Sequence, residues 1–168
     1  MKQISFDQVN DHLVNVISKE WMLITAGNRE KFNTMTASWG GVGYIWHKPV
    51  VFVFIRPERY TYEFTEANDY FTISFLGEEN KDIHKVCGSK SGRDTDKIKE
   101  TGLVPVFTDA GNVTFEQARL TLECKKLYEE MIQEGNFVDP VIFNRWYGDH
   151  GRPHKMYIAE IVNVFKKD

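Results

Sequence analysis

The sequence is poor in cysteine, because its 168 residues include two, Cys87 and Cys124, far apart and outside any Cys-x-x-Cys spacing. This pattern excludes a disulfide scaffold and is typical of a protein in the reducing cytoplasm. Among histidine and cysteine the closest pairs are His84 with Cys87 and His150 with His154, and no second pair at a zinc-site spacing accompanies either of them. We therefore expect no disulfide, no metal and a cytoplasmic location.

Long apolar runs and a strong charge of one sign are also absent. The longest apolar run, residues 50–55, is too short to cross a bilayer, and charged residues interrupt residues 1–15, unlike a signal peptide. Lys and Arg total 21 against 24 Asp and Glu, a formal net charge of -3. So weak a charge attracts no extended polyanion, so we expect no nucleic-acid partner. Because the apolar runs are short, we also expect no membrane span.

Several familiar motifs are missing as well. Gly40, Gly41 and Gly43 do not form the Gly-x-Gly-x-x-Gly fingerprint, and the sequence has no Walker loop, nucleophile elbow or His-Glu-x-x-His helix. A dinucleotide is therefore not expected to bind in the Rossmann manner. Aromatic residues, in contrast, are abundant at 14%, with 12 Phe, 7 Tyr and 4 Trp. Large flat side chains suit a β-rich core and can wall a pocket for a planar ligand.

Hydrophobic periodicity predicts a mainly β fold with a few short helices. Ser5 and Gln8 fit a capping box ahead of apolar residues at helical spacing, which predicts an opening amphipathic helix. Short apolar or alternating runs bounded by turn residues predict strands over residues 21–26, 32–39, 50–55, 70–76, 113–128 and 156–165. Further short helices are predicted over residues 62–68, over residues 78–87 closed by Gly88, and from an Asp94 cap to Gly102.

The order of these elements predicts an antiparallel barrel. Strands follow one another without regular helix alternation, which disfavours a doubly wound sheet. Residues 50–55 are apolar on both faces and predict a fully buried strand, whereas residues 70–76 alternate and predict a half-buried one. Residues 137–153 are aromatic and broken by proline. The length of 168 residues is that of one domain, so we expect a single domain over residues 1–168.

Small polar residues alternate through Asn33-Thr34-Met35-Thr36-Ala37-Ser38-Trp39 and then run into two glycines. Small side chains let a strand backbone approach a ligand closely. The alternative is an edge strand whose Thr and Ser side chains face water.

Two cationic segments have the composition of anion sites. Residues 56–61 place Arg56, Arg59 and Thr61 where a strand ends and a helix begins, and helix N-termini with adjacent arginines bind anions. Residues 89–97 form a second loop with hydroxyls and cations ahead of a helix. The alternatives are solvated arginines paired with Glu58 or Glu63 in the first segment, and a capped surface turn in the second.

Taken together, these segments resemble the flavin reductase-like family of FMN-binding split-barrel proteins, which includes the flavoredoxins. The resemblance covers most of residues 20–100 and rests on several weak motifs in the right order. They are residues 33–39, Lys48-Pro49-Val50, residues 56–61, His84, Cys87-Gly88 and Ser91-Gly92-Arg93-Asp94. It implies an antiparallel, Greek-key FMN-binding split β-barrel with a few short peripheral helices.

The resemblance also implies a cofactor site and a reaction. FMN would bind without a covalent bond, with its ring along residues 33–39 and its phosphate at Arg56, Arg59 and Thr61. NAD(P)H would pass a hydride to flavin N5, and no side chain would act as a nucleophile. The implied cofactor-binding residues are Asn33, Met35, Thr36, Ala37, Ser38, Trp39, Arg56, Arg59, Tyr60, Thr61, Cys87, Gly88, Ser91 and Lys97.

The electron acceptor, a small molecule or a protein, is left open, and so are other functions. One alternative is an electron carrier that a partner reduces, and a weaker one is a haem- or pyridoxine-phosphate-related split barrel. Trp39, Trp46, Tyr147 and His150 are further candidates to line the cleft. Members of the family are typically homodimers, so a second copy of the chain would complete the pocket, with residues 137–153 as candidates.

Overall fold

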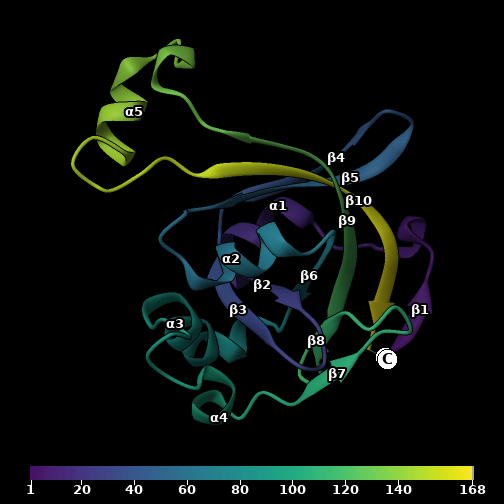
Figure 1. Ribbon diagram of the computed structural model, residues 1–168. Helices are drawn as coiled ribbons and strands as arrows, with labels where there is room; N and C mark the ends of the chain where they lie inside the picture. Colours follow the sequence, from purple (N-terminus) through teal and green to yellow (C-terminus); the bar gives the residue numbers. More distant parts are fainter. Residues whose placement is uncertain (168) are drawn as a thin grey trace.

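An antiparallel sheet that curls into a barrel forms the body of the molecule, as predicted (Figure 1). The computed structural model describes residues 1–167. The strand order is β3-β2-β6-β9-β10-β5-β4, and β1 pairs with β10. The strands are β1 (Lys2–Ile4), β2 (Met22–Gly27), β3 (Phe32–Ala37), β4 (Gly40–Ile45), β5 (Lys48–Ile55), β6 (Tyr70–Phe75), β9 (Leu120–Met131) and β10 (Lys155–Lys166).

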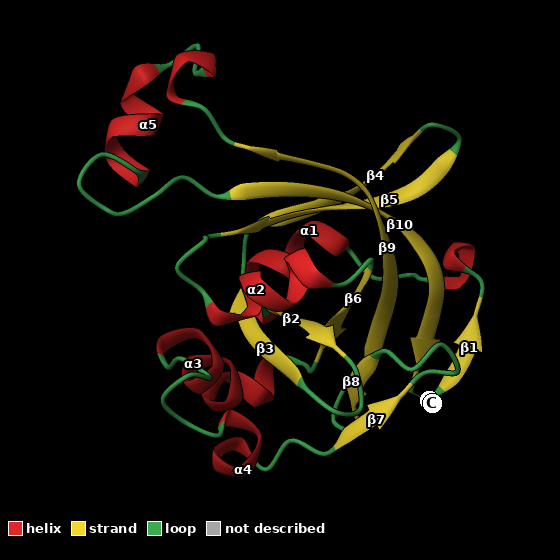
Figure 2. Ribbon diagram, in the orientation of Figure 1, coloured by secondary structure: helices red, strands yellow, loops and turns green. Residues whose placement is uncertain are grey.

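Short helices and a small hairpin surround the barrel (Figure 2). The helices are α1 (Leu13–Asn15), α2 (Tyr60–Ala67), α3 (Lys81–Ser89), α4 (Lys97–Thr101) and α5 (Pro140–Trp146), and the hairpin is β7 (Pro105–Phe107) with β8 (Val113–Phe115). Helical turns are η1 (Phe6–Gln8), η2 (Val16–Glu20), η3 (Glu78–Asn80) and η4 (Glu134–Asn136). α2 and α3 pack on β3, whereas α5 stands apart at the far ends of β9 and β10. In residues 1–167 no helix has the length and apolar character that a bilayer crossing requires.

Two apolar cores hold these layers together. The larger fills the barrel with side chains of β2, β5, β6, β9 and β10, among them Ile24, Val53 and Phe71. The smaller lies between the outer face of β2 and the α3–α4 region and contains Leu23, Leu76 and Cys87. β2 is therefore buried on both faces, and it fixes the position of the neighbouring strand β3.

The predicted opening helix is wrong. Ser5 and Gln8 do form the predicted capping box, in which the Ser5 N–H donates to Gln8 Oε1 at 3.0 Å. However, η1 ends after one turn. The chain becomes helical again only in the short segments α1 and η2. The strand β1 was not predicted, because a segment of three residues shows no periodicity.

Strand β4 and several boundaries also differ from the predictions. β4 was missed because it is rich in glycine and its turn to β5 uses Trp46 and His47 at positive φ, a conformation that glycine usually supplies. The predicted strand 113–128 is two strands, β8 and β9. α3 runs through Gly88. α4 begins at Lys97, and its N-cap is Asp96, whose carboxylate accepts from the Lys99 N–H at 3.1 Å, so Asp94 is not the cap.

Burial on β5 and β6 is the reverse of the expectation. Phe52 and Phe54 of β5 are half-buried, because this face of the strand is not covered by core. Thr72 and Ser74 of β6 are fully buried, because the β7–β8 hairpin lies on them. Thr72 donates to the Val113 carbonyl, and the Ser74 hydroxyl lies 2.9 Å from that of Thr114.

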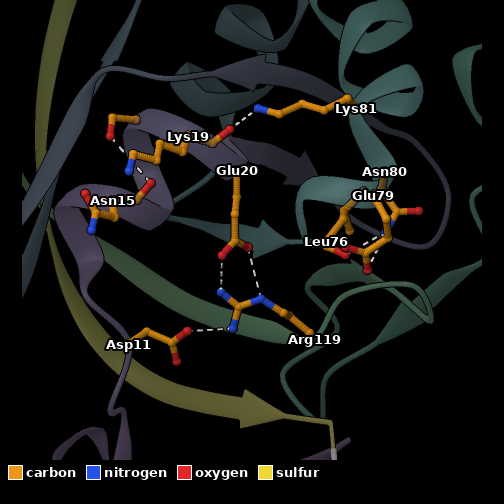
Figure 3. Close-up of polar contacts among 10 residues, drawn as sticks. Asp11, Asn15, Lys19, Glu20, Leu76, Glu79, Asn80, Lys81 and Arg119 are labelled. Atoms are coloured by element: carbon orange, nitrogen blue, oxygen red, sulfur yellow. Dashed lines mark hydrogen bonds and ion pairs between the residues drawn. The ribbon is translucent and has the colours of Figure 1, made fainter.

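A partly buried ion-pair network fastens the N-terminal segment to the barrel (Figure 3). Arg119 Nε and Nη2 both contact the Glu20 carboxylate, at 3.0 and 2.7 Å, and Nη1 contacts Asp11 at 2.6 Å. These pairs also raise the pKa of Arg119. The carboxylate side chains are 15% and 16% exposed, so water screens these pairs less than pairs on the open surface.

We expect Arg119→Ala to lower the free energy of unfolding by about 1–3 kcal/mol, because two poorly solvated carboxylates lose their partner. Urea denaturation of the two proteins measures the difference. The matched control is Lys85→Ala, which removes an ion pair whose side chains are 67% and 94% exposed. An equal effect of both substitutions would contradict the importance of the buried geometry.

Candidate functional site

A cleft of about 570 Å³ opens between β3, α3 and the end of β5. This volume lies in the range of small-molecule sites, about 300–1,000 Å³. Three of its side chains are cationic, Arg56, Arg59 and Lys85, and none of its lining residues within 1–167 is acidic. The lining residues are Trp21, Met35, Thr36, Ala37, Ser38, Trp39, Phe54, Arg56, Arg59, His84, Lys85, Gly88, Ser89, Trp146 and His154.

Strand β3 presents a free backbone edge to this region. It is the last strand of the sheet on its side, with β2 as its neighbour. The Thr34 carbonyl points away from β2, since it accepts from Lys97 Nζ at 2.7 Å. In an antiparallel strand the N–H and C=O of one residue point to the same edge, and successive residues alternate between the two edges. The backbone groups of Thr36, two residues after Thr34, therefore point to the same outer edge as those of Thr34. The cleft therefore contains backbone donors and acceptors that the sheet does not use.

A smaller hollow of about 140 Å³ adjoins the cleft and shares Arg59, Gly88 and Ser89 with it. Its other lining residues are Glu58, Tyr60, Lys90, Ser91 and Lys97. The first turn of α2 lies beside it, and no side chain caps this turn. Unfilled N–H groups at a helix start favour an anion.

Two cations of this hollow are held by carbonyl oxygens. Arg59 donates to Gly88 O at 2.8 Å and to Cys87 O at 3.0 Å, and Lys97 donates to Thr34 O at 2.7 Å. Neither forms an ion pair with a carboxylate of residues 1–167. Lys97 is 4% exposed, and burial lowers its pKa to about 8, with Arg59 acting in the same direction. Within residues 1–167 neither charge is therefore paired with a carboxylate, and Glu58, which also lines the hollow, pairs with Arg152.

Arg56 holds the opposite wall of the cleft in place. Its guanidinium donates to Trp146 O at 2.9 Å and to the His150 carbonyl, and it lies over the Tyr147 ring at 5.4 Å. These contacts join the end of β5 to α5 and the loop after it. The arginine pairs that the alternative hypothesis predicted do not form, because Glu58 pairs with Arg152 and Glu63 pairs with Arg93.

Aromatic side chains make up this wall. Trp39 packs edge-on against Trp146, with ring centroids 5.0 Å apart, and its ring centroid lies 5.2 Å from that of His154. His154 Nδ1 lies 3.0 Å from the Tyr147 hydroxyl. Burial lowers the pKa of His154 to about 4, with Arg56 acting in the same direction, so this imidazole is neutral near pH 7.

The structure brings most of the predicted cofactor residues together. Arg56, Arg59, Gly88 and residues 35–39 line the cleft, and Tyr60, Ser91 and Lys97 line the adjoining hollow. Asn33, Thr61 and Cys87 line neither of the two, and Asn33 lines a separate hollow beside Lys97. Asn33 Nδ2 donates to Thr61 Oγ1 at 2.7 Å, and Thr61 is fully buried.

Cys87 contributes its backbone carbonyl to the site, by holding Arg59, and not its sulfur. Its side chain belongs to the smaller core, as expected for a small buried hydrophobe, and its carbonyl accepts from Arg59. Burial raises the pKa of its thiol to about 11. The thiol is therefore protonated near pH 7 and is not a nucleophile.

Sequence reasoning placed some cleft residues wrongly and missed others. Trp46 lies 52% exposed in the β4–β5 turn, and neither His150 nor Tyr147 lines the cleft. His84, one of the residues that carry the family resemblance, lines the cleft and is fully buried. Residues that line the cleft but were not expected there are Trp21, Phe54, Lys85, Ser89, Trp146 and His154. An N-cap Asp139 followed by Pro140 was an available sign of the helix that carries Trp146.

Three other hollows are less suited to a charged planar ligand. One, of about 410 Å³, lies between β3 and the start of α4 and includes Lys97 together with the carboxylates of Asp94 and Asp96. A second, of about 570 Å³, lies by the β7–β8 hairpin and includes the carboxylates of Asp109 and Glu116. The third, of about 700 Å³, lies between α1 and β4, and its charged residue is Asp7. None of the three combines cations with the absence of carboxylates, so the cleft beside β3 is the stronger candidate.

The sequence profile described as a flavin reductase like domain matches residues 15–168. This chain belongs to the flavin reductase-like family. A search of curated protein sequences finds no match.

Solved structures share the fold. The FMN-binding domain of a flavin reductases-like enzyme from Shewanella baltica has a TM-score of 0.70 at 17% identity, covering 98% of this chain and 76% of that one. Flavoredoxin from Desulfovibrio vulgaris has a TM-score of 0.68 at 20% identity, covering 100% and 78%. The NADH:FAD oxidoreductase of Streptomyces globisporus, solved with NAD and FAD fragments, has a TM-score of 0.64 at 15% identity, covering 89% and 75%.

Proposed function

We propose that this flavin reductase-like protein is an NAD(P)H-dependent oxidoreductase that holds FMN non-covalently in the cleft beside β3 and passes the electrons to an acceptor. The observation that carries the proposal is the charge of the cleft. Arg56, Arg59 and Lys85 line it without an acidic residue, and the buried ammonium of Lys97 lies in the hollow that adjoins it. Such a site favours a ligand that is anionic and accepts electrons.

The residues present fit both ends of FMN. Trp39, Phe54 and Trp146 supply aromatic walls for a tricyclic ring, and the outer edge of β3 supplies backbone groups for its polar rim. Arg59, Lys97 and Ser91, with the uncapped start of α2, would hold the 5′-phosphate. Bound phosphate would supply the counter-charge that Arg59 and the buried Lys97 lack among residues 1–167.

Bound FMN would supply a hydride acceptor at N5, and the chain would supply binding, orientation and charge. The aromatic walls orient the ring and exclude water from its faces. The guanidiniums of Arg56 and Arg59 stabilise negative charge that develops near them. Cys87, His84 and His154 are all neutral near pH 7, as their pKa values of about 11, about 4 and about 4 require.

The choice of partner molecules rests on the solved neighbours and on exposed surface. The Streptomyces protein was solved with NAD fragments, which supports a nicotinamide nucleotide as reductant here.

The segment that carries α5 exposes Val138, Val141 and Ile142 at 102%, 66% and 47%, an apolar surface suited to a second copy of the chain. A homodimer in the cytoplasm, with both cysteines as free thiols, completes the proposal.

We expect purified protein loaded with FMN to lose its oxidised flavin absorption rapidly when NADH or NADPH is added in a stopped-flow spectrometer. The control is the same nucleotide with free FMN at equal concentration. Slow bleaching by both nucleotides would contradict the reductase and favour an electron carrier that a partner reduces, as the similarity to flavoredoxin suggests. A haem or pyridoxal phosphate spectrum would contradict flavin binding altogether.

We expect Arg59→Ala to weaken FMN by about 1.5–3 kcal/mol and to affect riboflavin much less, because riboflavin lacks the phosphate that the guanidinium would bind. Titration of both ligands by flavin fluorescence measures the two dissociation constants. Arg152→Ala, which removes an exposed arginine paired with Glu58, is the matched control. Equal weakening of both ligands would place the effect of Arg59 in the fold of α3 and not in phosphate binding.

FMN affinity should fall between about pH 7 and about pH 9.5, because Lys97 loses its proton as the pH rises through its pKa of about 8. Phosphate raises that pKa on binding, so association takes up a proton in this range, and the affinity falls by about tenfold. Isothermal titration in buffers of different ionisation enthalpy measures the proton uptake. The affinity of the protein for riboflavin, and that of the Lys97→Met variant for FMN, should depend little on pH. An equal fall in the affinities for FMN and riboflavin would rule out this role of Lys97.

A further inference from the structure

His84 contains a buried polar atom that the fold leaves without a partner. The residue lies on α3, is fully buried and belongs to the lining of the cleft. Its Nε2 has no hydrogen-bond partner among residues 1–167. An unsatisfied buried group of this kind destabilises a protein, so its retention beside a binding cleft calls for an explanation.

The contacts of the other ring nitrogen define the chemistry of Nε2. The Thr36 hydroxyl donates its hydrogen to the His84 carbonyl at 2.6 Å. With that hydrogen used, Thr36 Oγ1 can only accept from His84 Nδ1, which lies 3.4 Å away. Nδ1 therefore carries the ring hydrogen, and Nε2 has a free lone pair. Burial and the nearby Lys81 lower the pKa of His84 to about 4, so the ring stays neutral and Nε2 remains an acceptor.

An acceptor on the wall of a cleft selects a ligand with a hydrogen-bond donor. We propose that His84 Nε2 accepts a hydrogen bond from the N3–H of the bound isoalloxazine ring and thereby fixes the position of the ring against β3. Oxidised isoalloxazine has a single ring N–H, at N3. This inference rests on the proposed binding of FMN and adds a ring-positioning residue to it.

The surroundings of His84 keep the imidazole in place. Trp21 packs edge-on to it, with centroids 6.2 Å apart, and Lys81 Nζ lies 3.5 Å from the centre of the Trp21 ring. Figure 3 shows that the backbone before Trp21 is itself fastened, since Lys81 donates to the Lys19 carbonyl and Arg119 holds Glu20. Lys85, which also lines the cleft, is held by an exposed pair with Asp82, so its displacement by a ligand costs little.

The test follows the imidazole directly in the full chain. Protein labelled with ¹⁵N-histidine is titrated with FMN and with N3-methylated FMN, which lacks the donor. The His84 Nε2 resonance should begin as an unprotonated nitrogen without a hydrogen bond and move to lower frequency with FMN alone. An unmoved resonance under saturating FMN would overturn the role of His84 while leaving FMN binding established. If FMN does not bind at all, both the inference and the proposed function fail.

Variants separate a ligand contact from a structural role. We expect His84→Phe to bind FMN about three- to tenfold more weakly and to lose the preference for FMN over its N3-methyl form. His84→Gln, whose Oε1 supplies an acceptor, should recover that preference. The unliganded His84→Phe protein should lose little stability, because Nε2 makes no bond there and the Nδ1 contact to Thr36 Oγ1 is long at 3.4 Å, and His12→Phe at an exposed position is the control. Unchanged preference in a folded His84→Phe protein would overturn the proposal.

Discussion

The site depends on the positions of two cations that have no anionic partner. Lys97 reaches across from α4 to the Thr34 carbonyl on β3, and Arg59 reaches from the start of α2 to the carbonyls of Cys87 and Gly88. These bonds fasten β3, α2, α3 and α4 to one another. Burial lowers the pKa of each cation, and the charge of Arg59 lowers that of Lys97 further. Because desolvated like charges repel, the fold is held in an arrangement that an anion would stabilise.

The second wall is built by a different interaction. Arg56 ends β5 and donates to two carbonyls of the segment around α5, some 90 residues later in the chain. This contact brings Trp146 to the cleft, and His154 lies beside it as β10 begins. The aromatic wall is therefore coupled to α5, whose outer face is apolar and exposed. A second chain that covered α5 would also fix this wall, so association and ligand binding are expected to be linked.

Much of the fold was predictable because local patterns and tertiary structure agree. The β2–β3 hairpin, β5 and the long final strands carry clear periodicity or bounding prolines, and most of the predicted cofactor residues meet at one place. β4 was not predictable, because glycines and a non-glycine left-handed turn hide it. The burial of Thr72 and Ser74 and the use of the Cys87 carbonyl depend on elements distant in sequence. The positions of Trp146 and His154 in the cleft wall were not predicted for the same reason.

The charge distribution in the cleft bears on electron transfer as well as on binding. Both imidazoles on its wall are neutral, and the thiol of Cys87 beneath it is protonated, so Arg56, Arg59 and Lys85 determine its field. A positive field stabilises a ring more after it gains electrons than before. An acceptor at His84 Nε2, in contrast, interacts with a donor that the oxidised ring already has. In the proposed complex His84 would fix where the ring lies, whereas the arginines would adjust how readily it is reduced, and the two functions could vary independently.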